Sequence, residues 1–388
     1  MKVRFSRRLE NLPPYLFVEI DKAKRKARQE GRDLIDLGVG DPDLPTPRHI
    51  IEKLHEAAKD PKNHKYALDQ GMPALRQAIA DWYRKRFNVD LNPETEILPL
   101  IGSKEGIAHM PLAFVNSGDY VLAPNPSYPP YRGSTILADG MIYDMPLLEE
   151  NDFLPELNKI PLPVRKKARL MFLNYPNNPT GATADESFYQ KAVDFASKHN
   201  IIIAHDAAYS EMSFDGYKPM SFLEVEGAKE VGVEFHSLSK AYNMTGWRIG
   251  WVCGNADIIS GIAKVKSNID SGIFSAIQIA GIEALTGPQD HIQKMCAMYQ
   301  ERRNALCQGL RASINADFVV PKATFYVWVN VPKKYDSRSF SSLLLEKCDI
   351  VATPGVGFGS SGEGYIRFAL TVPKERIHEA LRRIKERL

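Results

Sequence analysis

The sequence predicts an α/β fold, with a mainly parallel sheet covered by helices on both faces and a smaller α+β domain beside it. Between about residues 47 and 280, short apolar segments alternate with amphipathic helical patterns, and this alternation is typical of a parallel sheet. After residue 281, a long helical region gives way to short strands mixed with helices. The 388 residues, 44% of them hydrophobic, suffice for one large and one smaller core.

The elements follow in order along the chain. A helix is expected at 14–30, ending at Gly31. The strands of the large domain, 47–280, are expected at 96–101, 120–124, 168–174, 200–205, 232–237 and 249–254. The small domain is expected to combine residues 1–46 with 281–388. Its strands are expected at 318–321, 325–332, 349–355 and 364–370, and its helices at 338–347 and 374–387.

Composition narrows the possible partners. The 50 basic and 47 acidic residues give a formal net charge of +3, which argues against nucleic acid or a membrane surface as a partner. No apolar run approaches the length of a membrane span, and because the N-terminal stretch lacks an apolar segment we expect no signal peptide. Its four cysteines lack CxxC spacing, so we expect reduced thiols, a cytoplasmic protein and no metal site.

Polar and aromatic side chains follow five of the expected strands. Ligands of open α/β sheets bind outside the carboxyl ends of the strands. The first of these strand ends is Gly102-Ser103-Lys104-Glu105-Gly106, where N–H groups at a helix start favour an anion such as phosphate. The other four ends carry, in chain order, Tyr128 with Tyr131, Asn178, Asp206 with Tyr209, and Ser239 with Lys240.

This set of side chains suits pyridoxal phosphate. The aldehyde of that cofactor needs a lysine, and its ring nitrogen needs a carboxylate that keeps it protonated. Phenol and amide groups suit its 3-oxygen, an aromatic side chain suits its ring face, and Arg248 adds a partner for its phosphate.

Each candidate alone also has a structural explanation. Asp206 fits a helix cap, Asn178 a turn and Tyr128 a packed loop aromatic, while GSKEG resembles a capping box. Their joint position at the ends of strands favours the binding site.

The motifs GSKEG, NNPTG, DAAY and SLSKAYNMTGWRIG follow one another along the chain in the order of the class I/II, fold-type I aminotransferases, and the resemblance to that family covers almost the whole chain. The resemblance implies a seven-stranded, mainly parallel sheet, pyridoxal phosphate as cofactor, and Lys240 as the Schiff-base lysine. It implies that Asp206 pairs with the pyridine nitrogen, that Tyr209 and Asn178 meet the 3-oxygen, and that Tyr128 stacks on the ring. The residues implied around the phosphate are Ser103, Lys104, Ser237, Ser239 and Arg248.

The resemblance also implies how substrate and partner subunit are bound. Tyr66 resembles the tyrosine that reaches the phosphate of the neighbouring subunit, which implies a homodimer with shared active sites. Arg367 resembles the arginine that grips the substrate α-carboxylate, and Gly40 resembles the glycine whose backbone approaches it. Without the resemblance, Arg367 fits an arginine on an exposed edge strand.

Within the family, the segments NLPPYLFVEID, LGVGDPDLPTP and HDAAYSE are most similar to those of LL-diaminopimelate aminotransferases. These enzymes exchange an amino group between LL-diaminopimelate and 2-oxoglutarate in lysine biosynthesis. Tyr15 then resembles a substrate-contacting residue. Where related enzymes place an asparagine from the partner subunit, this chain has Asp270, Ser271 and the nearby Asn268.

The predicted activity is ping-pong transamination with an amino acid and a 2-oxo acid. The alternatives are an aspartate, alanine or aromatic aminotransferase, a pyridoxal-phosphate-dependent C–S lyase or a decarboxylase. A regulatory protein of this fold would carry a DNA-binding module before it, and here the fold is expected to start close to Met1. The run GVGFGSSG at 355–362 has glycine spacing close to a dinucleotide fingerprint, but it precedes a strand. We interpret it as a flexible loop beside Arg367.

Overall fold

A seven-stranded sheet forms the centre of the molecule. The computed structural model describes residues 1, 3–13, 16–67 and 69–388. The strand order is β2-β8-β7-β6-β5-β3-β4, and only β8 runs antiparallel to its neighbours. The strands are β2 (Ile97–Leu100), β3 (Tyr120–Asn125), β4 (Met141–Pro146), β5 (Ala168–Asn174), β6 (Ile202–Asp206), β7 (Gly232–Ser237) and β8 (Gly250–Gly254). The predicted α/β fold is confirmed.

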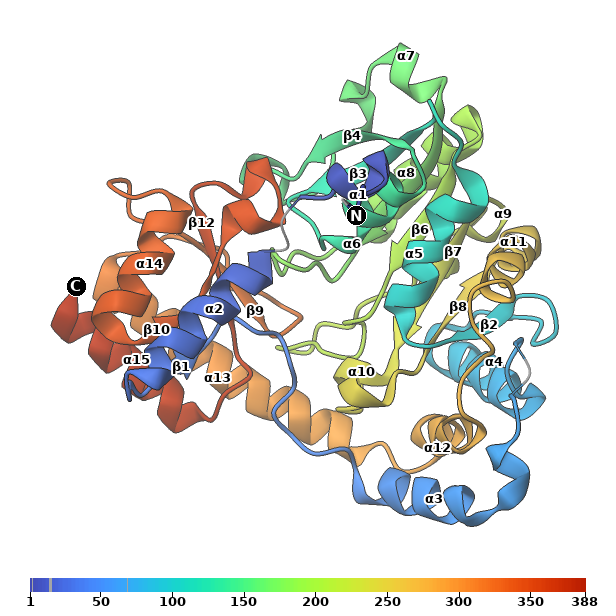
Figure 1. Cartoon of the computed structure of the whole chain (residues 1–388), viewed down its shortest axis with the longest axis horizontal. Coiled ribbons are helices and arrows are strands. Elements are labelled where there is room, and N and C mark those ends of the chain that lie inside the picture. The colour runs from blue at the N-terminus through green and yellow to red at the C-terminus, as the bar shows by residue number, and fades with distance from the viewer. Residues whose placement is uncertain (2, 14–15, 68) are drawn as a thin grey trace.

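Helices cover both faces of this sheet (Figure 1). Side chains alternate along each strand, so Phe172 of β5 packs on the side of α5 and α11, whereas Met171 and Leu173 pack on the side of α4 and α8. The helices around the sheet are α3 (Arg48–Lys59), α4 (Pro73–Phe87), α5 (Ser103–Phe114), α6 (Pro130–Leu137), α7 (Leu162–Arg165), α8 (Glu186–His199), α9 (Ala228–Val231), α10 (Leu238–Ala241), α11 (Ala256–Lys266) and α12 (Ser275–Thr286).

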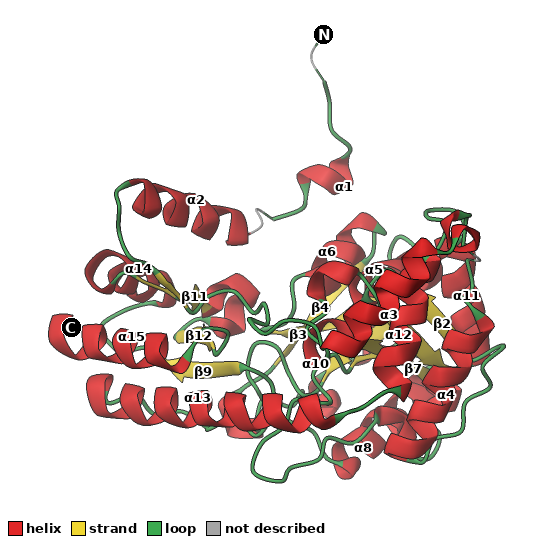
Figure 2. Cartoon of the chain, turned by 90° about the horizontal axis from the view of Figure 1, so that it is seen from below, coloured by secondary structure: helices red, strands yellow, loops and turns green. Residues whose placement is uncertain are grey.

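A second unit contains a small antiparallel sheet of order β11-β12-β9. Its strands are β9 (Tyr326–Asn330), β11 (Thr353–Pro354) and β12 (Tyr365–Ala369), and its helices are α13 (Asp290–Ile314), α14 (Ser337–Cys348) and α15 (Lys374–Arg387). β1 (Ile35–Asp36) pairs with β10 (Ile350–Val351) and so ties the N-terminal segment to this unit. α2 (Leu16–Gln29) lies beside the same unit, and α1 (Arg7–Glu10) precedes it (Figure 2). We propose residues 1–46 and 281–388 as the small domain and 47–280 as the large one, with one adjustment: α12 runs on to Thr286, and its Ala284 and Leu285 belong to the core of the large unit.

Two sequence expectations differ from the structure. The edge strand β4 was not predicted, because most of its side chains are partly exposed and it ends at Pro146, so it lacks a continuous apolar pattern. The expected strand at 318–321 is wrong. The carbonyls of Phe318 and Pro321 accept hydrogen bonds from Arg311 and Arg303 instead of from a neighbouring strand.

Among the described residues, the structure contains no helix with the length and apolarity that crossing a bilayer requires. All four cysteines are free thiols, in agreement with the expectation from their spacing.

A fully buried carboxylate ties the central strands together. Glu234 of β7 is inaccessible to solvent. The donors around its two oxygens, at 2.7–3.0 Å, are the Tyr83 and Ser221 hydroxyls, the Phe222 N–H and the rings of His205 and His236. Burial raises the pKa of Glu234, but the bonds from His205 and His236 outweigh it and hold this pKa below its usual value. The carboxylate is therefore charged and fully satisfied.

We expect Glu234→Gln to lower the free energy of unfolding by about 3 kcal/mol, because removing one partner from a buried charged network leaves the others unsatisfied. Urea unfolding measures this change. Glu226→Ala, at an exposed position in the segment between β6 and β7, should change the free energy of unfolding by less than about 0.5 kcal/mol. Equal stability of Glu234→Gln and the unsubstituted protein would contradict the role of this network.

Candidate active site

A cavity of about 620 Å³ lies at the carboxyl ends of the parallel strands and is closed by residues of the second unit. Most of the predicted site residues line it together: Gly40, Ser103, Lys104, Tyr128, Asn178, Asp206, Tyr209, Ser237, Ser239, Lys240, Arg248 and Arg367. The parallel register explains this convergence, since the ends of β3, β5, β6 and β7 meet at one edge of the sheet.

One end of the cavity, formed by the Gly102–Ser103 turn and Arg248, has the chemistry of an anion site, and we call it the anion cradle. α5 begins at Ser103 after Gly102, whose φ of 78° favours glycine and which has no side chain to cap the helix. A Cβ at Gly102 would collide with the guanidinium of Arg248. Arg248 is held by Thr245 O at 2.8 Å and Ile101 O at 3.4 Å. A helix N-terminus beside a guanidinium is suited to a phosphate.

Lys240 carries the amine of the site. It lies in α10, which Ser237 caps by accepting from the N–H of Ser239 at 3.1 Å. Its Nζ donates to Gly40 O at 2.8 Å and lies 5.4 Å from the centre of the Phe325 ring. Burial lowers the pKa of Lys240. A lowered pKa makes the neutral amine, which is nucleophilic and basic, more accessible.

Asp206 is buried at the end of β6, and both its oxygens have donors. Oδ2 accepts from the Tyr131 hydroxyl at 2.8 Å, and Oδ1 accepts from the Ala208 N–H at 3.3 Å. Tyr131 in turn stacks on Phe172, with 4.8 Å between ring centres. Burial raises the pKa of Asp206, and the bond from Tyr131 opposes this shift. The contact with Tyr131, which lies in the first turn of α6 three residues after Tyr128, was not predicted.

We expect Tyr131→Phe to destabilise the cofactor-free protein in a pH-dependent way. The lost bond favours the charged form of Asp206, so its removal raises this pKa further. The expected loss in the free energy of unfolding is about 1.5–3 kcal/mol, the value for a bond to a charged group. The whole loss is expected at pH values above the pKa of Asp206, where the carboxyl is charged, and it becomes smaller as the pH falls below that pKa. Urea unfolding at pH values on both sides of this titration measures the effect.

Tyr175→Phe is the matched control for this experiment. Tyr175 is also buried, and its hydroxyl donates to the neutral carbonyl of Phe153 at 2.9 Å. Its substitution should cost the same at both pH values. A pH-independent loss in Tyr131→Phe as well would show that Asp206 is not charged in the folded protein.

Arg367 is held at the other end of the cavity, and it is buried rather than on an exposed edge. Nη1 donates to Asn178 Oδ1 at 2.8 Å, and Nη2 donates to Gly38 O at 2.7 Å. The guanidinium carbon lies 4.1 Å from the ring centre of Tyr326 and 4.6 Å from that of Phe358. Two aromatic faces and two acceptors thus fix its orientation.

Tyr326 and Phe358 are site residues that the sequence reasoning missed. The Tyr326 hydroxyl lies 3.1 Å from that of Tyr209, and a Cβ on Gly40 would overlap the Tyr326 hydroxyl. Phe358 belongs to the glycine-rich run 355–362, which the structure places beside Arg367 as expected. This run is anchored, because Asn125 bonds Ser360 and Ser361 and the Ser127 N–H donates to Phe358 O. The remaining unpredicted lining residues are Asp21, Val39, Asp41, Pro129, Asn174, Ala208 and Thr245.

Three predictions are not among the described residues that line the cavity. Tyr66 is 93% exposed and is not among the described residues that line the cavity. Tyr15 lies outside the described residues. In the segment with Asn268, Asp270 and Ser271, the Asp270 carboxylate contacts Lys266 Nζ at 2.6 Å, and Asn268 donates to Lys264 O at 2.8 Å.

Comparison with known proteins agrees with this geometry. The family "Aminotransferase class I and II" matches residues 32–384. An LL-diaminopimelate aminotransferase of Syntrophobacter fumaroxidans is 56% identical over 98% of this chain and 97% of its own, and one of Halothermothrix orenii is 55% identical over 97% of both. The substrate-bound structure of BacF from Bacillus subtilis superposes with a TM-score of 0.95 at 41% identity, covering 100% of this chain and 98% of its own. The resemblance drawn from the motifs is confirmed, and the chain belongs to the class I and II aminotransferases.

Proposed function

We propose that the protein is a pyridoxal-phosphate-dependent aminotransferase that exchanges an amino group between LL-diaminopimelate and 2-oxoglutarate, in the cytoplasm, as a step of lysine biosynthesis. The observation that carries this proposal is one cavity that holds an amine, a buried carboxylate, an anion cradle and an oriented guanidinium. The names of the relatives at 55–56% identity supply the substrate.

The residues present fit pyridoxal phosphate. The turn at Gly102 has no room for a side chain because Arg248 packs against it, and Ser103, Lys104 and Arg248 line the cavity as partners suited to a phosphate. Asp206 is a buried carboxylate that suits a protonated ring nitrogen. Tyr128 lines the same cavity and suits the ring face. The residues that would hold the cofactor are Ser103, Lys104, Tyr128, Asn178, Asp206, Tyr209, Ser237, Ser239, Lys240 and Arg248.

When bound, pyridoxal phosphate supplies an electron sink for the charge that develops at the substrate Cα. Arg367 would bind the substrate α-carboxylate through its guanidinium, and Gly40 lines the same cavity. Lys240 lines the same cavity and is the base that the site offers to the substrate Cα. The neutral Nζ of Lys240 would take the proton from the substrate Cα and deliver it to the C4′ carbon of the cofactor. The Asp206 carboxylate would balance the positive charge of the protonated ring nitrogen.

A panel of amino donors with 2-oxoglutarate, followed by glutamate formation, tests the substrate. We expect LL-diaminopimelate to give the highest kcat/KM. Faster turnover of aspartate, alanine or an aromatic amino acid would leave the aminotransferase but exclude the proposed substrate. Ammonia, pyruvate or CO2 in stoichiometric amounts would favour a lyase or a decarboxylase instead.

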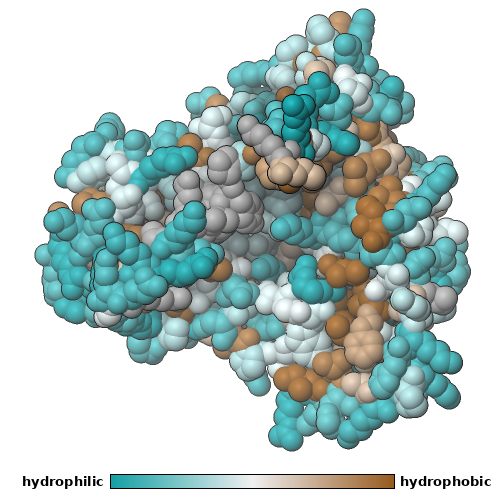
Figure 3. All heavy atoms as spheres, in the orientation of Figure 1, coloured by the Kyte–Doolittle hydropathy of each residue, from teal (hydrophilic) through white to brown (hydrophobic). Residues whose placement is uncertain are grey.

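We also propose a homodimer with shared active sites, in which Tyr66 reaches the phosphate of the partner subunit. Tyr66 is fully accessible in the single chain, and exposed apolar side chains occur at Ile51, Leu112, Ile269 and Phe274. Figure 3 shows hydrophobic atoms gathered over the part of this face where α3 and α5 lie.

Light scattering tests the dimer, and subunit mixing tests the sharing. Tyr66→Ala and Lys240→Ala proteins should each be impaired alone. If Tyr66 acts across the interface, unfolding and refolding them together should form mixed dimers in which one of the two sites has both residues. No recovery in the mixture would contradict the shared site.

A further inference from the structure

Lys266 is the last residue of α11 and is 1% exposed along its side chain. A lysine is rarely buried to this extent without partners. Its Nζ contacts two carboxylates, with Asp270 Oδ1 at 2.6 Å and Glu105 Oε1 and Oε2 at 3.1 and 3.3 Å. Asp270 Oδ1 also accepts from the Gly272 N–H at 3.0 Å. The ammonium therefore joins three parts of the chain: α11, the connection to α12 and the first turn of α5.

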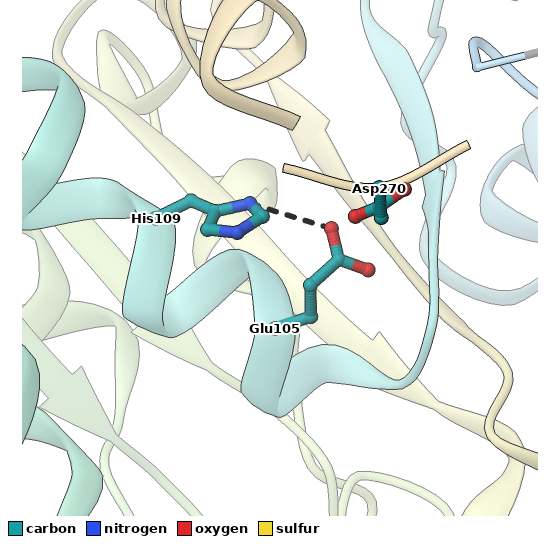
Figure 4. A group of neighbouring side chains, drawn as sticks. All are labelled: Glu105, His109 and Asp270. Atoms are coloured by element: carbon teal, nitrogen blue, oxygen red, sulfur yellow. Dashed lines mark ion pairs between the residues drawn. The ribbon is translucent and has the colours of Figure 1, made fainter. Parts of the chain in front are cut away.

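Part of this cluster has the donor types of a metal site. Glu105, His109 and Asp270 each offer a ligand atom within 4.8 Å of the others, and Figure 4 shows the His109 ring beside the Glu105 carboxylate. The ammonium of Lys266 already lies against both carboxylates, and a second cation there would be repelled by it. Because the Lys266 ammonium occupies the place of a metal ion in this cluster, we look for the role of the cluster in the other contacts of Glu105.

Glu105 holds the backbone that leads into the anion cradle. Its Oε2 accepts from the Ile101 N–H at 2.6 Å, while the carbonyl of Ile101 accepts from Arg248 Nη2 at 3.4 Å. Ile101 precedes Gly102 and Ser103, the turn that opens α5. A chain of contacts thus runs from Lys266 through Glu105 to the backbone that forms the cradle.

The positive charge of Lys266 also affects the electrostatics of the anion cradle. Glu105 lies in the first turn of the helix whose N-terminus faces the cradle, where an uncompensated carboxylate would repel a phosphate. The contact with Lys266 compensates that charge. Burial keeps this pairing strong, because solvent screens it little.

Resting on the proposed function, we propose that Lys266 is a positioning residue for the cofactor phosphate, acting through Glu105 on the Ile101–Ser103 turn. It touches neither cofactor nor substrate. Its removal should weaken the contribution of the phosphate to binding and leave the rest of the cofactor's contacts in place.

The test compares two ligands that differ only in the phosphate. Cofactor-free protein is titrated with pyridoxal phosphate and with pyridoxal. The dissociation constant of pyridoxal divided by that of pyridoxal phosphate measures how much the phosphate contributes to binding. We expect this ratio to fall by about tenfold in Lys266→Met, the lower end of the effect of residues that orient a binding group. Asp270→Asn, a milder change to the same contact, should lower it less and keeps the test decisive if Lys266→Met does not fold.

Arg303→Met is the matched control. Arg303 of α13, in the second unit, is also a buried cation, 3% exposed, and forms an ion pair with Asp215. It should lose stability without changing the ratio. Equal weakening of both ligands, or an unchanged ratio in folded Lys266→Met and Asp270→Asn, would overturn the proposal. Failure of the unsubstituted protein to prefer pyridoxal phosphate would instead overturn the proposed function.

Discussion

Lys240→Ala is expected to abolish transamination, with a fall in turnover of at least about 10⁴-fold, the upper end of what a positioned acid–base group contributes. Lys240 is proposed both to attach the cofactor and to move the Cα proton. Its Nζ lies in the cavity with a lowered pKa, and alanine supplies no group for either role. Initial rates with LL-diaminopimelate and 2-oxoglutarate measure the loss.

Borohydride reduction followed by peptide mapping adds a second readout. We expect a pyridoxyl group on Lys240 in the unsubstituted protein. Lys264→Ala, exposed on α11, is the control and should keep full activity. Lys104 also lines the cavity, so a label on Lys104, or undiminished turnover in Lys240→Ala, would transfer the assignment to that residue.

Asp206→Asn is expected to lower kcat by about 10²–10³-fold, the usual effect of removing one preorganised electrostatic partner from a site. The substitution keeps the shape of the side chain and removes its charge. An amide holds a protonated ring nitrogen poorly, so the electron sink is weakened while the phosphate and Arg367 are unaffected. We expect KM to change much less than kcat.

The bound cofactor reports on the same change through the pH dependence of its absorbance, which should shift in Asp206→Asn. Tyr131→Phe acts on the same carboxylate from its other side, and its effect on kcat should be smaller because the charge remains. Asp194→Asn, exposed on α8, should leave kcat unchanged. Equal activity of Asp206→Asn and the unsubstituted protein would show that the carboxylate does not face the ring nitrogen.

Much of the site could be predicted because its residues follow strands. Six of the seven strands of the main sheet have an apolar pattern that marks where each ends, and in a parallel sheet the ends share one edge. Asp206 and Lys240 were placed by this rule, and the motifs then gave Arg367 its role. The structure agrees by bringing these residues into one cavity.

The missed residues act through partners that are distant in the sequence. Tyr131 and Asp206 are 75 residues apart, Tyr209 and Tyr326 are 117 apart, and Lys266 and Glu105 are 161 apart. No local pattern marks such pairs, since an aromatic or charged residue at those positions has the same appearance in a sequence whether or not it supports a site. The tertiary packing of the folded chain decides which of them meet.

The alternation of β6 has a consequence for how this protein can change. His205 points into the network around Glu234, and its neighbour Asp206 points into the cavity. A shift of one residue would exchange their faces. Depending on its direction, either the imidazole would replace the carboxylate at the cavity, or the carboxylate would replace the imidazole beside Glu234. A substitution at His205 affects the buried network, and a substitution at Asp206 affects the cavity. An insertion or deletion within β6 would disturb both the fold and the active site at once. Divergence in substrate preference must therefore come from the segments that border the cavity, while the length of this strand stays fixed.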